Sequence, residues 1–456
     1  MAQLMTTGEL ARAVSADLRG DGRVGFSSVA TDSRTLPAGA LFVALTGENF
    51  DGHDYVQSAR ERGAAAALVE RAVDIDIPQL IVPETRRAFG ASAAHWRSRF
   101  ELPMIAVTGS NGKTTVTQMI AAILAVEHGD KGRLATRGNL NNEIGVPLML
   151  WQLGKQHRAA VFELGMNHPG EIAWLAQLVK PTVALVNNAQ REHQEFMQSV
   201  EATAYENGEV IAALGGDTVA VFPADDACAP IWRQLAGTRR VIDFALEGSA
   251  IVTATFQLEE SGARVSMATP SGVIDAQLAV GGRHNVRNAL AATACSIAAG
   301  VSADAIASGL GAWRPAAGRG ARLRTADGWL IDDTYNANPD SMRAAIDLLA
   351  ASPPLRVLVL GDMGEVGARG GEFHREIGEY ACERGIDALF AIGPSMRESV
   401  RAFGQSASHF GDIDALTTAL RAALQPGSTV LVKGSRFMRM ERVVQALTMS
   451  QPEGTH

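Results

Sequence analysis

The chain has 456 residues, so we expect two to four domains rather than a single core. Its composition, 46% hydrophobic and 20% charged, is typical of a globular protein and excludes a disordered one. The 41 basic and 49 acidic residues give a net charge of −8, which argues against nucleic acid as the main partner. The three cysteines lie far apart without C-x-x-C spacing, which indicates neither a disulfide framework nor a zinc site.

The N-terminal stretch "MAQLMTTGELARAV" lacks a basic start followed by an apolar core, so we expect no signal peptide. The most membrane-like run, "ALAATACSIAAGV", is too short to span a bilayer. We therefore expect a cytoplasmic protein, and a monomer by default.

In chain order, residues 1–100 alternate short strands such as "GALFVAL" and "QLIVP" with Ala-rich helical stretches, which predicts an N-terminal α/β domain. From Met104 the strands "MIAVT", "AAVFELG", "TVALVNNA" and "TVAVFPADD" are separated by helical segments. Apolar strands in that arrangement indicate a parallel sheet covered on both faces. The alternating pattern of residues 239–280 predicts an antiparallel extension of this sheet.

The segment "RHNVRNALAATACSIAAG" predicts a helix that ends at Gly300. Pro, Gly and Arg in "AWRPAAGRGARLR" then mark a boundary, so we predict a central domain over residues 101–314. A third α/β domain, residues 315–456, follows with the strands "WLIDDTYNANP", "RVLVLGD", "ALFAIG" and "TVLVKGS".

The strand "MIAVT" runs into "GSNGKTT" and then into an apolar helix, which predicts a phosphate-binding loop. Glycines at 109 and 112 let backbone N–H groups approach an anion, and Lys113 is placed for the β- and γ-phosphates. A Thr114 or Thr115 hydroxyl is suited to Mg²⁺. The loop is one residue shorter than the usual G-x-x-x-x-G-K-[ST], because position 107 is Val. The expected nucleotide loop comprises Gly109, Ser110, Asn111, Gly112, Lys113, Thr114 and Thr115.

Polar residues follow the other predicted strands, and ligands gather at the carboxyl ends of parallel strands. Glu163 ends one strand as a candidate metal ligand, the alternative being a solvated carboxylate. Asp225 and Asp226 end another, where turn residues are equally expected. After a third strand come Asn187, Asn188 and His193, which this position places on the same rim. In the third domain "DDTYNANPDS" adds a dense polar cluster, in which Ser341 or Asp340 is expected to cap the next helix.

Eight motifs in order resemble the Mur ligase family over essentially the whole chain, and within it the members that add D-Ala-D-Ala. These motifs are "TDSRTLPAGALFVAL", "TGSNGKTT", "RGNLNNEIGVPL", "FELGMNHPGEI", "GRHNVRNALAA", "DDTYNANPDSM", "LGDMGEVG" and "LVKGSR". The resemblance implies a three-domain α/β architecture with a central P-loop parallel-sheet ATPase domain and a C-terminal Rossmann-like domain. It also implies the short phosphate loop, ATP and Mg²⁺ as cofactors, and a role in peptidoglycan synthesis.

The resemblance further implies residue roles. Catalysis is expected of Lys113, Glu163 and His193. Metal binding is expected of Thr114, Glu163 and His193. Beyond the loop, ATP is expected to meet Asn285 at the adenine, and Arg319 and Asp333 across the cleft. Ser33 and Arg34 are expected at the uridine diphosphate, and Asn139 and Asn142 along the peptide channel. Tyr335, Asn336 and Asn338 are expected where the third domain closes on ATP and the dipeptide.

One position departs from the family pattern. Where the family offers a lysine that becomes carbamylated and steadies a second magnesium, "AYENGEV" places Asn207. A neutral amide does not replace an anionic carbamate charge for charge. We expect Glu206, Glu209 or a water network to compensate, or the second metal to be held more loosely.

The implied reaction joins the carboxylate of UDP-MurNAc-tripeptide to the amine of D-Ala-D-Ala through an acyl phosphate formed with ATP. The family member that adds the third amino acid is a rival, but its D-N-P-R motif is replaced here by "YNANPDSM". A folylpolyglutamate synthetase-like ligase is a more remote alternative. A GTPase lacks support because no N-K-x-D motif is present, and a nucleic-acid motor is disfavoured by the charge. Diaminopimelate and lysine both stay open at the third position of the acceptor peptide.

Overall fold

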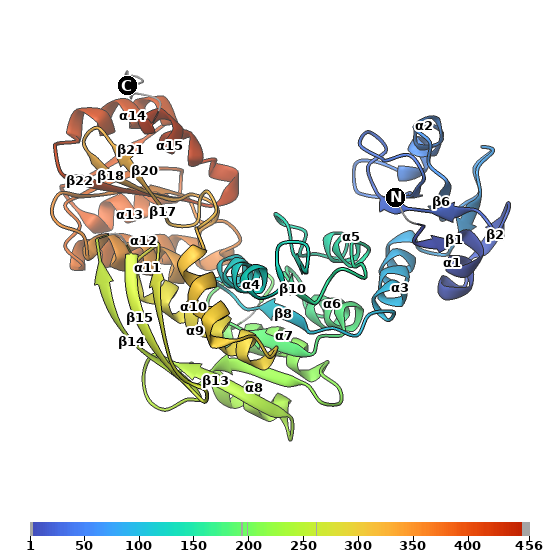
Figure 1. Ribbon diagram of the computed structural model, residues 1–456. Helices are drawn as coiled ribbons and strands as arrows, with labels where there is room; N and C mark the ends of the chain where they lie inside the picture. Colours follow the sequence, from blue (N-terminus) through green and yellow to red (C-terminus); the bar gives the residue numbers. More distant parts are fainter. Residues whose placement is uncertain (1–2, 193–194, 198, 261, 449–456) are drawn as a thin grey trace, which may run out of the picture.

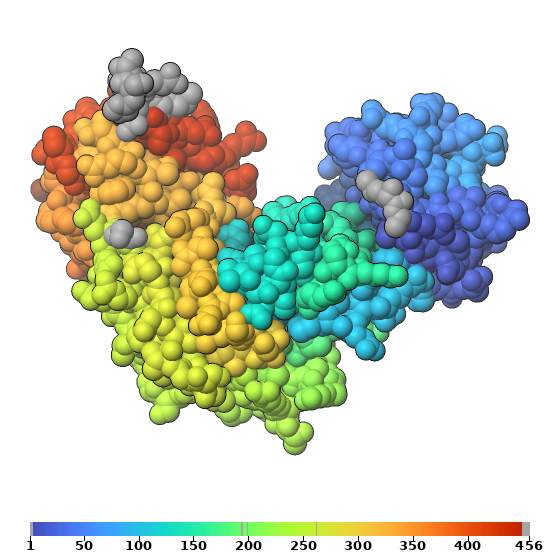
Figure 2. Space-filling model, in the orientation of Figure 1, coloured from blue at the N-terminus to red at the C-terminus, as the bar shows by residue number. Residues whose placement is uncertain are grey.

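The computed structural model describes residues 3–192, 195–197, 199–260 and 262–448, which form three lobes, each with its own β-sheet (Figure 1). The N-terminal lobe and the C-terminal lobe stand apart on either side of the central lobe (Figure 2). The predicted three-domain α/β architecture is confirmed, and the boundaries at residues 100 and 314 remain our proposal. Within the described ranges, no helix has both the length and the apolarity needed to cross a membrane.

The N-terminal lobe contains a five-stranded sheet in the order β2-β7-β6-β5-β4, parallel except for β2. Its strands are β2 (Asp17–Arg19), β4 (Ser28–Ala30), β5 (Ala40–Val43), β6 (Ala66–Val69) and β7 (Gln79–Ile81). A two-stranded ribbon joins β1 (Met5–Thr6) to β3 (Gly25–Phe26). The helices are α1 (Thr7–Val14), α2 (Val56–Glu61) and α3 (Thr85–Arg97), with the 3₁₀ turn η1 (Gly52–Tyr55). Strands β5 and β6 are buried along their whole length, as continuous apolar runs in a parallel sheet require.

Helix α3 joins the N-terminal lobe to the central lobe. The Trp96 ring stacks on Trp151 with centroids 5.4 Å apart, and its Nε1 donates to the Leu153 carbonyl at 3.1 Å. Arg97 Nε donates to the Val179 carbonyl at 2.8 Å. Apolar side chains of both lobes therefore share one core at this junction.

The central lobe is built on a nine-stranded sheet in the order β16-β15-β14-β13-β12-β11-β8-β10-β9. The parallel part has β8 (Met104–Thr108), β9 (Arg133–Ala135), β10 (Ala159–Glu163), β11 (Val183–Val186), β12 (Val219–Pro223), β13 (Arg240–Ala245) and the start of β14. The antiparallel extension predicted for residues 239–280 is confirmed for β14 (Val252–Glu259), β15 (Gly262–Thr269) and β16 (Gly272–Leu278). It is wrong for the start of that range, because β13 pairs in parallel with β12. The helices are α4 (Lys113–His128), α5 (Gly145–Leu150), α6 (Glu171–Val179), α7 (Val200–Ala212), α8 (Ala229–Ala236), α9 (Arg283–Ala298) and α10 (Ala303–Ala312).

Helices cover both faces of this central sheet because its strands are apolar on both sides. Along β8, Met104 and Ala106 face the core that contains α3, α6 and α7. Ile105 and Val107 face the opposite core, which contains α4, α9 and α10. Successive side chains of a strand point to opposite faces, so one apolar strand anchors two helical layers. Helix α9 ends near Gly300, as predicted, with Gly300 at φ +78°.

The C-terminal lobe has a six-stranded sheet in the order β17-β18-β22-β19-β20-β21, parallel apart from β17. Its strands are β17 (Ala321–Thr325), β18 (Gly328–Asp333), β19 (Arg356–Gly361), β20 (Ala388–Ile392), β21 (Ala407–Phe410) and β22 (Ser428–Lys433). The helices are α11 (Pro339–Ala350), α12 (Gly370–Glu383), α13 (Met396–Phe403), α14 (Ile413–Ala423) and α15 (Glu441–Thr448), with 3₁₀ turns η2 (Gly367–Arg369) and η3 (Arg436–Met438). Alternate residues of β19 face two separate cores, as in the central lobe.

Candidate functional site

The candidate site begins at the carboxyl ends of three neighbouring central strands. Strand β8 lies between β10 and β11, all parallel. Val107 is in register with Glu163, the last residue of β10, and Thr108 is in register with Val186, the last residue of β11. The phosphate loop, Glu163 and the segment after β11 therefore start from the same edge of the sheet.

The two loop glycines have backbone conformations that other residues rarely adopt. Gly109 has φ +126°, and a Cβ there would lie 2.9 Å from the Asn187 backbone nitrogen. Gly112 has φ +82°, and a Cβ there would lie 2.4 Å from Asn288 Oδ1. Both the dihedral angles and the close neighbours require glycine at these two positions. Without a side chain there, the backbone of the loop can approach a bound phosphate closely.

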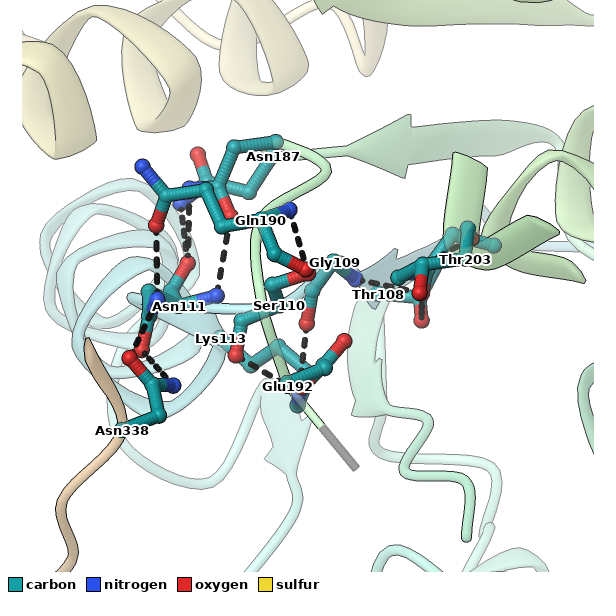
Figure 3. Close-up of polar contacts among 12 residues, drawn as sticks. Thr108, Gly109, Ser110, Asn111, Lys113, Asn187, Gln190, Glu192, Thr203 and Asn338 are labelled. Carbon is teal, nitrogen blue, oxygen red and sulfur yellow. Dashed lines mark hydrogen bonds and ion pairs between the residues drawn. The ribbon is translucent and has the colours of Figure 1, made fainter. Parts of the chain in front are cut away.

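Lys113 lies at the start of α4 and folds over this loop (Figure 3). Its Nζ donates to the carbonyls of Gly109 and Ser110, the second at 3.2 Å, and forms an ion pair with Glu192 at 3.3 Å. The Lys113 side chain is 16% exposed. An ammonium group beside the positive end of a helix provides the charge that a polyphosphate needs.

The segment that follows β11, residues 187–192, holds the phosphate loop in place, and we call it the rim loop (Figure 3). Asn188 Oδ1 accepts from the Asn111 backbone N–H at 2.9 Å. Gln190 accepts from Asn111 Nδ2 at 2.6 Å, and its backbone N–H donates to Ser110 Oγ at 2.8 Å. The shape of the phosphate loop thus depends on contacts with the rim loop.

Asn207 lies on α7 and is fully buried. Its Oδ1 accepts from Thr108 Oγ1 at 2.6 Å and from the Gly109 backbone N–H at 2.9 Å. Its Nδ2 donates to the Thr203 carbonyl at 3.1 Å. The amide therefore fixes the first turn of the phosphate loop directly.

Glu206, considered as a compensating group for Asn207, is engaged elsewhere. Its carboxylate accepts from the backbone N–H groups of Gly170 and Ile172 at 2.9 and 3.0 Å. It thus caps the N-terminus of α6, where a negative charge is favourable. Glu209, half-buried on α7, remains a candidate for the compensating role.

Thr114 and Glu163 are the described residues of the predicted metal set, and His193 lies outside the described residues. Glu163 is buried and accepts from Asn141 Nδ2 at 2.8 Å. Among the described residues there is no group of three or more His, Cys, Asp or Glu arranged for a metal. A hydroxyl and one carboxylate are hard oxygen donors. They fit Mg²⁺, which usually keeps several waters and takes further ligands from phosphates.

The C-terminal lobe reaches the phosphate loop through two residues of the predicted set. Asn338 Nδ2 donates to Asn111 Oδ1 at 2.9 Å. Arg319 donates to Thr114 Oγ1 at 3.0 Å, and its guanidinium lies 3.8 Å from the centre of the Tyr335 ring. Asn338 is also the N-cap of α11, with Ser341 as its reciprocal partner in a capping box. The expected N-cap at Asp340 or Ser341 is therefore wrong, because these residues lie inside the first turn.

Asp333 and Lys433 are in register at the ends of the neighbouring strands β18 and β22, and Asn336 lies in the loop that follows β18. Lys433 Nζ donates to Asp333 Oδ2 at 2.6 Å and to the Asn336 carbonyl at 2.9 Å. Asn285 is buried near the start of α9, where its Nδ2 donates to the Gly281 carbonyl at 2.8 Å.

The residues predicted for the uridine and peptide ends are separate from this cluster. Ser33 is buried in the N-terminal lobe, and the neighbouring Arg34 is exposed and pairs with Asp32 at 2.8 Å. Asn139 is exposed in the loop after β9. Asn142 Oδ1 accepts from the Gly145 N–H at 2.9 Å at the start of α5. The structure thus brings Arg319 and Asn338 onto the phosphate loop, whereas Ser33 and Arg34 lie in a different lobe.

Sequence reasoning missed four residues that contact this cluster, namely Asn141, Gln190, Glu192 and Asn288. The pairing of Lys113 with Glu192, 79 residues away, has no local sequence signal. Asn288, six positions after the start of the "GRHNVRN" motif, accepts from Asn187 Nδ2 at 3.0 Å. The dense Asn content of the motifs was the available signal, because buried amides usually have hydrogen-bonding partners.

The fold and this loop define a P-loop nucleotide-binding protein with three α/β lobes. Family models match the Mur ligase family catalytic domain at residues 26–107, the Mur ligase middle domain at 107–296 and the Mur ligase glutamate ligase domain at 318–436. The UDP-N-acetylmuramoyl-tripeptide--D-alanyl-D-alanine ligase of Escherichia coli (strain K12) is 42% identical over 456 residues, 99% of each chain. The chain belongs to the Mur ligase family.

Solved structures agree with this assignment. Crystal structure I of MurF from Acinetobacter baumannii has a TM-score of 0.92 and 34% identity, covering 97% of this chain and 98% of that one. MurF ligase from Thermotoga maritima in complex with ADP has a TM-score of 0.82 and 26% identity, covering 92% and 96%. Both similarities extend over all three lobes.

Proposed function

We propose that the protein is an ATP-dependent ligase that joins D-Ala-D-Ala to UDP-MurNAc-tripeptide and forms UDP-MurNAc-pentapeptide for peptidoglycan synthesis. The observation that carries this proposal is the 42% identity over the whole chain to a ligase of that printed name. The phosphate loop and the C-terminal lobe that meets it at Asn338 and Arg319 support it. A cytoplasmic, monomeric enzyme remains our expectation.

In this proposal an oxygen of the tripeptide carboxylate attacks the γ-phosphorus of ATP, which forms an acyl phosphate and releases ADP. The amine of the dipeptide then attacks the acyl carbon and loses a proton, and inorganic phosphate leaves as the amide forms. Lys113 and the backbone N–H groups of residues 112 and 113, at the start of α4, stabilise the charge on the transferring phosphoryl group. Mg²⁺, when bound, neutralises phosphate charge, and Thr114 and Glu163 are the described residues that would hold it. Arg319 reaches the same end of the loop from the C-terminal lobe.

The remaining assignments follow the family resemblance. Asp333 and Asn285 are assigned to ATP, and Ser33 with Arg34 to the uridine diphosphate. Asn139 and Asn142 are assigned to the tripeptide. Tyr335, Asn336 and Asn338 are assigned to the closing of the C-terminal lobe, and His193 to the metal.

Phosphate release from ATP tests the proposal directly. The purified protein is given UDP-MurNAc-tripeptide, D-Ala-D-Ala, or both, and the product is weighed by mass spectrometry. Release that needs both substrates, with a new amide product, is the expected result, and parallel assays with diaminopimelate and lysine tripeptides identify the acceptor. A K113A variant controls for contaminating ATPase. If a single amino acid replaces the dipeptide, or if ATP turns over without either substrate, the substrate assignment is refuted.

A further inference from the structure

Arg191, in the rim loop of the central lobe, is bound by two carboxylates of the C-terminal lobe. Its Nη2 donates to Asp340 Oδ1 at 2.6 Å and its Nε to both oxygens of that carboxylate at 3.2 Å. Nη1 and Nη2 donate to the two oxygens of Glu376 at 2.7 and 3.1 Å. The Arg191 backbone N–H also donates to Asp340 Oδ2 at 2.8 Å. One side chain of the central lobe therefore forms ion pairs with carboxylates of both α11 and α12.

The surroundings of Arg191 differ from those of an ordinary surface ion pair. Its side chain is 22% exposed, and its guanidinium lies 5.4 Å from the centre of the Phe373 ring. Arg343 donates to Glu376 at 3.2 Å, so two cations balance two carboxylates. Exposed single pairs contribute little, whereas bidentate arginine–carboxylate contacts with reduced solvent access are stronger and fix geometry.

The neighbours of Arg191 in the chain contact the phosphate loop. Gln190 bonds to Ser110 and Asn111, and Glu192 pairs with Lys113. Consecutive Cα atoms are about 3.8 Å apart, so a shift of Arg191 displaces both neighbours. Helix α11, whose Asp340 holds Arg191, also provides the Asn338 that pairs with Asn111.

We propose that Arg191 is a positioning residue that couples docking of the C-terminal lobe to the shape of the phosphate loop. With the lobe docked, Asp340 and Glu376 hold the rim loop, and the rim loop holds Ser110, Asn111 and Lys113. This inference rests on the proposed ligase function, and it adds a role for a residue outside the phosphate loop and outside the predicted site.

The test compares R191A and R191K with the matched control R401A, which removes a pair with Glu398 at 2.7 Å on the exposed face of α13. Donor and acceptor dyes at the exposed Cys382 and at an introduced D217C report the distance between the C-terminal and central lobes. Cys228 and Cys295 are buried, which keeps labelling selective. Energy transfer with and without ADP, and kcat and KM for ATP, are measured for each variant.

We expect R191A to increase the mean distance between the two dyes or to widen its distribution. We also expect it to lower kcat/KM for ATP about tenfold. R191K is expected to recover part of the loss, because an ammonium does not contact two carboxylates bidentately. R401A is expected to behave as wild type. If R191A is poorly folded, E376Q and D340N remove one partner each and are expected to give the same direction.

The proposal is overturned if R191A or both partner variants leave the lobe distance and kcat/KM for ATP unchanged within about twofold. It is also overturned if R191A lowers thermal stability alone, because a residue needed merely for folding does not change KM in the folded protein. Failure of the ligase assignment is distinguishable. In that case the dipeptide is not ligated by wild type, while the ADP-dependent distance change still responds to R191A.

Discussion

Replacing Asn207 by leucine tests how far the phosphate loop depends on one buried amide. The change removes the acceptor of the Thr108 hydroxyl and the Gly109 N–H, at 2.6 and 2.9 Å, in a position with no exposed surface. A buried donor left without an acceptor costs about 1–3 kcal/mol, so the two together cost about 2–6 kcal/mol. The loop relieves this cost by moving Gly109 out of its present position.

A cost of about 3 kcal/mol against the binding-competent loop lowers ADP affinity about 100-fold, because apparent affinity scales with the competent fraction. Isothermal titration of ADP measures this loss, and hydrogen exchange of the peptide that covers residues 104–112 measures the release of the loop. The control T203V lies on the same helix and is equally buried, and it removes a bond to the Ser199 carbonyl at 3.2 Å without touching the loop. Wild-type ADP affinity and unchanged exchange in a folded N207L would refute the reasoning.

Three further predictions follow from the same contacts. Gly112→Ala abolishes nucleotide binding measured by titration, because φ is +82° and the new methyl group meets an amide oxygen at 2.4 Å, whereas Gly216→Ala (φ +58°, open space) keeps affinity. The hydrogen bond from Arg191 holds the pKa of Glu376 below its ordinary 4.5. Its stabilisation is therefore present above that pH and lost as pH falls through the lower folded pKa, so the thermal midpoint of E376Q is less sensitive to acid than that of wild type. Added bicarbonate leaves turnover unchanged, because the amide nitrogen of Asn207 is not a nucleophile that forms a carbamate and already donates to the Thr203 carbonyl. A bicarbonate-dependent rise, with a modification found near α7 by mass spectrometry, would contradict this.

The secondary structure around the phosphate loop and the type of the central sheet could be predicted from the sequence. Strand, glycine turn and helix at residues 104–128 follow from apolar runs, from glycines that accept positive φ and from a helix start that needs no side-chain cap. Buried strands between helices indicated the parallel sheet, and alternation over residues 239–280 indicated its antiparallel extension. The departure at Asn207 was likewise visible, since it concerns residue type at a motif position.

Tertiary structure decided how the motifs are joined. Arg191 meets Asp340 and Glu376, 149 and 185 positions away, and a charged residue in a polar loop is equally well satisfied by water until the lobes dock. Asn207 bonds to Thr108 across 99 positions, a pairing set by the packing of α7 on the sheet and not by spacing. Glu206 lies next to Asn207 in the chain but points to α6, because neighbouring helical residues face different directions. Sequence patterns report on a few neighbouring residues, so they place candidate site residues at the carboxyl ends of the strands. Which of these residues contact one another is determined by how the helices and the separate sheets pack.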